Sequence, residues 1–144
     1  MKINSLEKED VVFRTLLKEK IKSNNNELSP LHSVSRNPNY IQFIQFEITD
    51  QDQFVAGLTG RIYWSCLEID DLFIEEPYRN QGLGTRLIEN IIHLASEKKL
   101  KFILLTTFSF QAKPFYEKLG FYVIGEIKNY PEKHSLYTLR YDIQ

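Results

Sequence analysis

The feature that most constrains this chain is a pair of glycines, Gly82 and Gly84, between a short apolar run and a strongly amphipathic segment. The chain has only six glycines, and two of them fall within residues 79–85. Glycine lets the backbone bend sharply from a strand into a helix, so that successive N–H groups converge at the start of the helix. The pair therefore indicates either an anion-binding junction suited to phosphate or a tight turn without a ligand.

Two common nucleotide-binding motifs do not fit this junction. A Rossmann fingerprint requires a third glycine at position 87, which is Leu87 in this chain. A Walker A loop requires Gly-Lys followed by Ser or Thr, and that pattern does not follow Gly84. An anion bound here would therefore be held in a different sequence context from either motif.

Apolar residues recur with periods that predict strands alternating with helices. Residues 84–98 repeat at helical spacing, and residues 102–107 form the almost continuous apolar run of a strand covered on both sides. Residues 23–39 contain three consecutive asparagines and two prolines, so we expect a loop there. The predicted helices are 7–22, 84–98 and 112–119, and the predicted strands are 40–48, 54–64, 67–75, 102–107, 121–127 and 136–141.

This order places antiparallel hairpins around one strand–helix–strand crossover. The predicted fold is α/β (α+β), with a mixed, mostly antiparallel sheet of about six to seven strands and helices on both faces. Alternation predicts that Phe54 and Trp64 share one face of their strand with Ala56, Leu58 and Ile62. We expect a single domain over residues 1–144, because domains commonly hold roughly 100–150 residues.

Charge is balanced overall but divided along the chain. The formal net charge is −1, which argues against a nucleic acid or an anionic membrane held by bulk charge. Residues 47–76 carry eight acids and one base, whereas residues 77–118 carry seven bases and three acids. The first stretch suits a cationic partner and the second an anionic one, although two solvated faces would give the same pattern.

Cysteine and histidine are scarce. The single cysteine, Cys66, cannot form a disulfide within the chain, and one cysteine with three scattered histidines suggests no metal site. The N-terminal residues have no apolar signal-like core, and no run of about 18 apolar residues occurs. The expected location is therefore the cytoplasm, with no membrane partner.

Two short motifs together resemble the GCN5-related N-acetyltransferase family. Arg79-x-x-Gly82-x-Gly84 is similar to that family's R/Q-x-x-G-x-G/A loop, and residues 115–121, Phe-Tyr-Glu-Lys-Leu-Gly-Phe, are similar to its F-Y-x-x-x-G-F segment. The two motifs occur in the family's order, separated by a helix and a buried strand. The resemblance covers roughly residues 53–141.

The resemblance implies acetyl-coenzyme A as acetyl donor, with no metal. It implies that the glycine loop binds the pyrophosphate and that a strand backbone meets the carbonyl and pantetheine arm. Many family members have an asparagine after the next strand, where this chain offers the hydroxyls of Thr107 or Ser109 instead. The implied cofactor-binding residues are Leu72, Phe73, Ile74, Arg79, Asn80, Gln81, Gly82, Leu83, Gly84, Thr85, Thr107 and Ser109.

The resemblance also implies how transfer to an amine would proceed. Tyr116 matches the tyrosine that protonates the departing thiolate. An amine with a pKa near 10.4 is mostly protonated at neutral pH, so a base is needed. Glu68, Asp70 and Asp71 are the candidates; simple alternation places Glu68 and Asp70 on one face of their strand and Asp71 on the other. Direct transfer to a primary amine of a small molecule or peptide is expected, because no activated cysteine is visible.

Other interpretations remain open. A non-catalytic acyl-coenzyme A-binding or sensing module on the same fold would keep both motifs. An enzyme using a longer acyl chain, or a protein amine, would keep them too. The resemblance leaves a homodimer open as the assembly, and it does not identify the amine.

Overall fold

The structure, a computed structural model, describes residue 5, residues 8–30 and residues 40–144. The chain divides into two compact units, residues 1–40 and residues 41–144, and each is described by itself. The predicted loop over 23–39 lies partly outside the described residues, which leave out 31–39.

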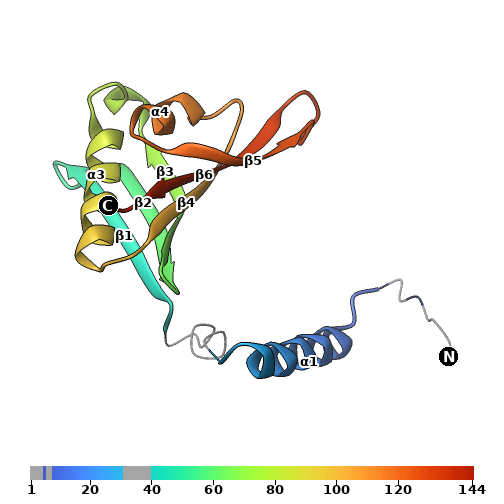
Figure 1. Ribbon diagram of the computed structural model, residues 1–144. Helices are drawn as coiled ribbons and strands as arrows, with labels where there is room; N and C mark the ends of the chain where they lie inside the picture. The colour runs from blue at the N-terminus through green and yellow to red at the C-terminus, as the bar shows by residue number, and fades with distance from the viewer. Residues whose placement is uncertain (1–4, 6–7, 31–39) are drawn as a thin grey trace. The chain divides into compact units, whose positions relative to one another are not determined.

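The first unit contains one helix, α1 (Val11–Leu28) (Figure 1). Asp10 begins the helix, because its carboxylate accepts a hydrogen bond from the Phe13 N–H at 2.9 Å. The prediction that the helix ends at residue 22 was wrong, since α1 continues through the three asparagines. Pro30 provides the stop: it disfavours helical geometry at Ser29, which is extended with φ −143°.

The second unit is a six-stranded sheet in the order β1-β2-β3-β4-β6-β5 (Figure 1). Every neighbouring pair is antiparallel except β3 with β4. This confirms the predicted mixed, mostly antiparallel sheet. The strands are β1 (Gln42–Asp50), β2 (Gln53–Tyr63), β3 (Cys66–Ile74), β4 (Phe102–Phe108), β5 (Tyr122–Lys128) and β6 (Ser135–Asp142).

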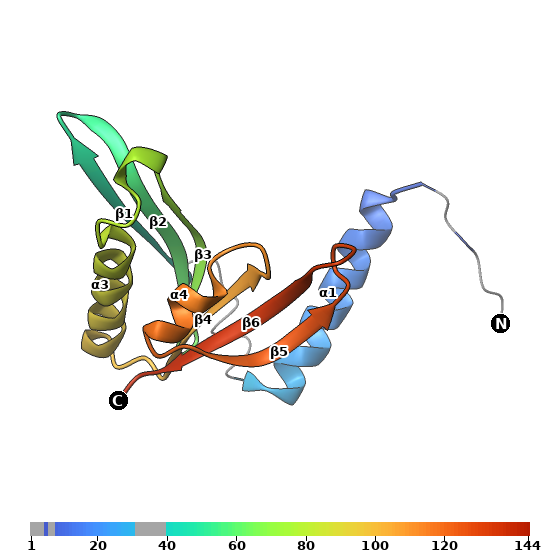
Figure 2. The ribbon, with the colours of Figure 1, turned by 90° about the horizontal axis from the view of Figure 1, so that it is seen from above.

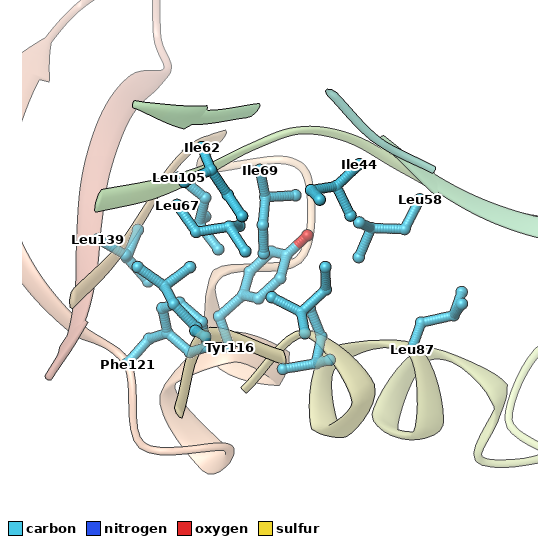
Figure 3. Close-up of a cluster of buried hydrophobic side chains, with 14 of the residues drawn as sticks. Ile44, Leu58, Ile62, Leu67, Ile69, Leu87, Leu105, Tyr116, Phe121 and Leu139 are labelled. Atoms are coloured by element: carbon cyan, nitrogen blue, oxygen red, sulfur yellow. The ribbon is translucent and has the colours of Figure 1, made fainter. Parts of the chain in front are cut away.

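One face of the sheet carries both α-helices of this unit, α3 (Leu83–Glu97) and α4 (Lys113–Lys118). Within residues 41–144 the other face carries no α-helix, so helices on both faces stay a prediction for the chain as a whole. The predicted apolar stripe of α3 is buried in the core, together with side chains from β1, β2, β3, β4 and β6. Figure 3 shows Tyr116 of α4 within this core, with Phe121 beside it. No helix among the described residues is long and apolar enough to cross a membrane.

A β-bulge corrects the predicted facing of β2. The register with β1 shifts so that Ile48 pairs with Ala56 but Thr49 pairs with Phe54, which leaves Val55 as the extra residue. Val55 is buried, whereas Phe54 is 46% exposed. Trp64 lies in the β2–β3 turn with φ 53° and is 56% exposed. Ala56, Leu58 and Ile62 are buried, so the prediction that Phe54 and Trp64 share a face with them was wrong.

Candidate functional site

The site begins where β3 and β4 separate. Their parallel pairing covers Cys66–Glu68 against Phe102–Leu104 and goes no further among the described residues. Figure 2 shows the two halves of the sheet diverging from this point like the arms of a V. A cleft of about 560 Å³ lies here. Its lining is Ile69, Asp70, Asp71, Leu72, Phe73, Ile74, Arg79, Leu105, Thr106, Thr107, Phe110, Gln111, Ala112 and Tyr116.

The separation leaves backbone groups of β3 facing the cleft. Phe73 pairs with Gly57, and the N–H of Glu75 donates to the Val55 carbonyl at 2.8 Å, so these alternate residues turn their backbone groups toward β2. Leu72 and Ile74 therefore turn theirs toward β4, where no strand pairs with them. Buried polar groups without partners are costly, so this edge is suited to hydrogen bonding a ligand.

A second cavity, of about 400 Å³, lies at the start of α3. It shares Leu72, Ile74, Arg79 and Ala112 with the cleft, so the two hollows share a wall. Asn80 and Gly82 both have left-handed backbone angles, with φ 60° and 80°. The remaining lining is Gly82, Leu83, Gly84, Thr85, Asn80 and Phe115.

The turn delivers the first N–H groups of a 15-residue helix to this cavity. No side chain caps them at Gly82, and the first N–H groups of any helix lack partners within the helix. Together with the helix dipole, they form a site suited to an anionic group such as a phosphate.

The two glycines of this turn serve different purposes. Gly82 has φ 80°, which other residues adopt only with strain, although a Cβ there would meet nothing within 4 Å. Gly84 has ordinary helical geometry, but a Cβ on it would lie 3.1 Å from the Phe115 ring and 3.2 Å from Ile74 Cδ1. Gly82 therefore shapes the turn, whereas Gly84 lets α3 approach α4 and β3 closely.

Arg79 is held at the junction between the two cavities. Its Nε donates to the Ile74 carbonyl at 3.0 Å, and its guanidinium lies 5.8 Å from the centre of the Phe73 ring. These contacts leave the charge in the walls of both hollows. Gln81, by contrast, donates to the Pro77 carbonyl at 3.0 Å and is absent from the lining of either cavity.

Tyr116 forms the opposite wall of the cleft. Its side chain is 7% exposed and packs between Phe115 and Phe121, with ring centroids 5.0 and 5.8 Å away. Figure 3 shows its hydroxyl pointing away from α4 toward the strand that carries Ile69, which also lines the cleft. Burial raises the pKa of this phenol, so it keeps its proton at neutral pH.

A β-bulge in β3 changes the predicted arrangement of the three carboxylates. Thr59 pairs with Asp71 and Gly60 with Ile69, so Asp70 is the extra residue. Thr59 and Arg61 lie on the same face of β2, and they contact Asp71 and Asp70 respectively. Asp70 and Asp71 therefore share one face of the sheet, and the prediction that Asp71 faces the other way was wrong.

The three carboxylates differ in how they are neutralised. Arg61 contacts Asp70 with both Nε and an Nη, the closest pair 2.7 Å apart, and reaches Glu68 at 3.5 Å. Glu68 also accepts from the Tyr63 hydroxyl at 2.7 Å. Asp71 accepts only a 3.3 Å hydrogen bond from Thr59 among the described residues, and no cation pairs with it there.

The β4–α4 loop completes the rim of the cleft. Gln111 Oε1 accepts from the Phe108 N–H at 2.8 Å and from the buried Thr107 hydroxyl at 3.4 Å. This fixes the orientation of the side-chain amide beside the cleft. Within residues 40–144, nothing accepts a hydrogen bond from the Gln111 amide nitrogen, so its donors remain for a ligand.

Ser109 joins this loop to the β5–β6 hairpin and does not line the cleft. Its N–H donates to the Ser135 carbonyl at 2.8 Å, and its Oγ accepts from the Ser135 N–H at 3.2 Å. Its Oγ also lies 3.1 Å from His134 Nδ1. His134 meets Phe110 edge to face at 4.8 Å, and Phe110 stacks on Phe108 at 5.2 Å.

Cys66 lies outside the cleft at the start of β3. It is 4% exposed, and burial raises the pKa of its thiol to about 11. The thiol is therefore protonated at neutral pH and poorly suited to act as a nucleophile. No cluster of three or more metal-ligating side chains occurs among the described residues.

Comparison with known proteins identifies the family. The sequence profile of the Acetyltransferase (GNAT) family matches residues 10–121, well over half of the chain. The chain belongs to this family. The fold agrees: an acetyltransferase from Bacillus cereus superposes with a TM-score of 0.82 at 27% identity, over 96% of this chain and 97% of that one.

Sequence relatives share this GNAT core but are only partly covered. A blasticidin-S acetyltransferase from Streptomyces morookaense is 31% identical over 57% of this chain and 61% of its own length. A peptidyl-lysine N-acetyltransferase from Salmonella typhimurium is 35% identical over 65% and 61%. A spermine/spermidine N(1)-acetyltransferase from Bacillus subtilis is 37% identical over 51% and 47%. The chain thus spans less than two thirds of each of these relatives.

The structure brings together most of the candidate site residues that the sequence singled out. Two of the three carboxylates and Tyr116 line the cleft, and most of the glycine loop lines the adjoining cavity. Glu68, Gln81 and Ser109 lie outside both linings. Sequence reasoning missed Phe110 and Gln111, although Gln111 stands only two residues beyond the expected asparagine position and carries the same amide group.

Proposed function

We propose that this chain is an acetyl-coenzyme A-dependent N-acetyltransferase that transfers the acetyl group directly to a primary amine. The observation that carries the proposal is the shared wall between two hollows. An anion-binding helix start lies at one end, a buried tyrosine hydroxyl at the other, and an unpaired strand edge between them. Family membership agrees with this chemistry.

The residues present fit the cofactor. The N–H groups of Leu83, Gly84 and Thr85 suit the pyrophosphate, with Arg79 adding positive charge. The backbone groups that Leu72 and Ile74 turn toward the cleft suit the amides of the pantetheine arm, with the Ile74 carbonyl also accepting from Arg79 Nε. Gln111 supplies the amide contact that Thr107 and Ser109 were expected to replace, since Thr107 is buried and already bonded to Gln111.

When bound, acetyl-coenzyme A supplies an activated thioester carbonyl. The Leu72 N–H is the donor best placed for negative charge that develops on the carbonyl oxygen, an interaction worth roughly 3 kcal/mol. Asp71 takes a proton from the attacking ammonium, directly or through water. Tyr116 gives its proton to the sulfur as the carbon–sulfur bond breaks and the carbon–nitrogen bond forms. The new amide nitrogen releases its remaining excess proton to solvent, and solvent returns a proton to Tyr116.

Asp71 is favoured as the base because its competitors are already paired. The carboxylate oxygens of Asp70 and Glu68 are already engaged, Asp70 by Arg61 and Glu68 by Arg61 and the Tyr63 hydroxyl, whereas Asp71 accepts only from Thr59 among the described residues. Direct transfer is favoured because the Cys66 thiol is buried and protonated. The amine acceptor is supported by the relatives, whose names give blasticidin S, peptidyl lysine, and spermine or spermidine as substrates.

The test is thiol release from acetyl-coenzyme A, measured with a thiol-reactive dye, across a panel of polyamines, aminoglycosides, amino acids and peptides. Amine-dependent thiol release with an acetylated product in the mass spectrum is the expected result. Tight binding of acetyl-coenzyme A without thiol release for any amine would instead favour a non-catalytic sensing module. An absence of binding would contradict both.

A further inference from the structure

The outer face of the sheet, opposite α3 and α4, contains a third cavity that the proposed reaction does not use. It has a volume of about 490 Å³. It lies over β1, β2 and the second half of β3, and its lining is Gln45, Phe46, Glu47, Phe54, Gly57, Leu58, Thr59, Asp71 and Phe73.

Strand register shows how the cavity is built. Gly57 pairs with Glu47 on one side and with Phe73 on the other. Because Gly57 has no side chain, a gap remains on the outer face of the sheet between the side chains of Glu47 and Phe73. The bulge at Val55 turns Phe54 over this gap, since a Cβ on Gly57 would lie 3.1 Å from the Phe54 ring.

The chemistry of the walls favours a cation. The exposed rings of Phe54 and Phe73 supply aromatic faces, which attract ammonium groups. Glu47 has no hydrogen bond or ion pair within the described residues, and Asp71 has only the bond from Thr59. By contrast, the acids that Arg61 neutralises, Glu68 and Asp70, do not line this cavity.

The cavity adjoins the reaction cleft. Asp71 and Phe73 line both hollows, so a ligand can extend from one into the other past them. Asp71 and Glu47 are two strands and two residues apart in register, which separates their Cα atoms by roughly 12 Å. A linear aliphatic chain with a nitrogen at each end can span that distance.

We propose that this cavity binds a second ammonium group of the acceptor, which makes linear diamines and polyamines the substrate class. This rests on the proposed function. The reacting amine lies at Asp71, and the distal ammonium lies between Glu47 and the Phe54 ring. A substrate with one amine leaves the distal cavity empty.

The test compares kcat/KM for linear diamines of increasing length with that for monoamines of the same carbon length. Diamines should be preferred by about 3- to 30-fold, as expected from one exposed ion pair and one cation–π contact, with the optimum among the longer diamines. Glu47→Gln should remove most of this preference while leaving monoamine turnover unchanged. Phe54→Leu should weaken it while keeping the bulk of the side chain.

Glu89→Gln provides the matched control, because Glu89 is an exposed acid on α3 outside all three cavities. It should retain the full preference. Equal turnover of diamines and monoamines by the unaltered protein, or a parallel loss of both in Glu47→Gln, would overturn the proposed cation site.

A binding measurement separates this proposal from the proposed function. The amide resonances of Gly57 and Thr59 should shift when a long diamine is titrated into the protein, and the shift should weaken in Glu47→Gln. Unmoved resonances would sink the cation site even if the enzyme is active. If the resonances shift but no amine is acetylated, the cation site is supported and the proposed acetyl transfer is contradicted.

Discussion

The first and second halves of β3 have different neighbours in the sheet. Cys66–Glu68 pairs with strands on both sides, and Cys66 and Leu67 are buried. From the bulge at Asp70 onward, β3 pairs only with β2 and its other edge faces the cleft. A single extra residue thus divides a strand that stabilises the core from a strand that is available for binding.

The carboxylates of the two halves of β3 differ in their partners. In the first half, Arg61 and Tyr63 bind Glu68, so the carboxylate belongs to a structural network. In the second half, Asp71 has no cation partner among the described residues and lines two cavities. The division can be tested by substitution and by pH, in order of decreasing expected effect.

The largest effect is expected at Tyr116, which lines the cleft opposite the part of β3 that does not pair with β4. Tyr116→Phe should lower kcat by about 100- to 10,000-fold, because it removes the proton donor, while the ring still packs in the core. Steady-state kinetics with equilibrium binding of acetyl-coenzyme A should show lost turnover and nearly unchanged affinity. An unchanged kcat would remove Tyr116 from the acid role.

Truncation in the two halves should affect stability unequally. Leu67 is fully buried, so Leu67→Ala should lower the free energy of unfolding by about 2–5 kcal/mol. Leu72 is only partly buried, so Leu72→Ala should cost less. Urea unfolding followed by circular dichroism measures both, and equal losses would contradict the division of β3.

Replacing Asp71 and Asp70 one at a time should show which carboxylate acts as the general base and which belongs to a structural ion pair. Asp71→Asn should lower kcat by roughly 10- to 100-fold, at or below the usual range for a general base. Asp70→Asn is the matched control and should change kcat by less than about 3-fold, since Asp70 is held by Arg61. A larger loss in Asp70→Asn would transfer the role of base to that residue.

The smallest expected effect is the pH dependence of stability that Cys66 causes; this residue lies in the part of β3 that pairs with both neighbouring strands. The pKa of Cys66 is raised to about 11 by burial, so the folded state keeps a proton that the unfolded state releases above about pH 9. Stability should therefore be unaffected below pH 9 and fall by about 1–2 kcal/mol between pH 9 and 11.

Thermal unfolding across this pH range measures the effect. Cys66→Ala should flatten the dependence, and Tyr63 should contribute a further decline, because burial raises its pKa to about 12. A stability that rises with pH over this range would show that the thiol ionises more easily in the folded state.

Sequence periodicity was sufficient to predict the order of helices and strands, but it could not predict the two β-bulges. The buried stripe of α3 and the strand–turn–helix junction at Gly82 follow from local patterns. The exposed Phe54 and the outward-facing Asp71 do not, because a bulge shifts every later side chain and depends on the partner strand.

Two further points could not be predicted from the sequence. Three consecutive asparagines and two prolines suggested a loop from residue 23, but the asparagines continue α1 until Pro30 ends it. Gly84 belongs to a recognisable motif, yet its closeness to Phe115 and Ile74 is a contact between three separate elements. Neither the reason for that glycine nor the role of Gln111 is visible in a local window of sequence.

The reciprocal bonds between Ser109 and Ser135 have a mechanical consequence. They tie the β4–α4 loop to the β5–β6 hairpin, and His134 braces Phe110 at the rim of the cleft. A movement of the hairpin is thereby transmitted to Phe110, so the width of the entrance depends on a loop that lines none of the cleft. Differences in hairpin length or rigidity would therefore retune which acceptors enter, while the chemistry inside stays the same.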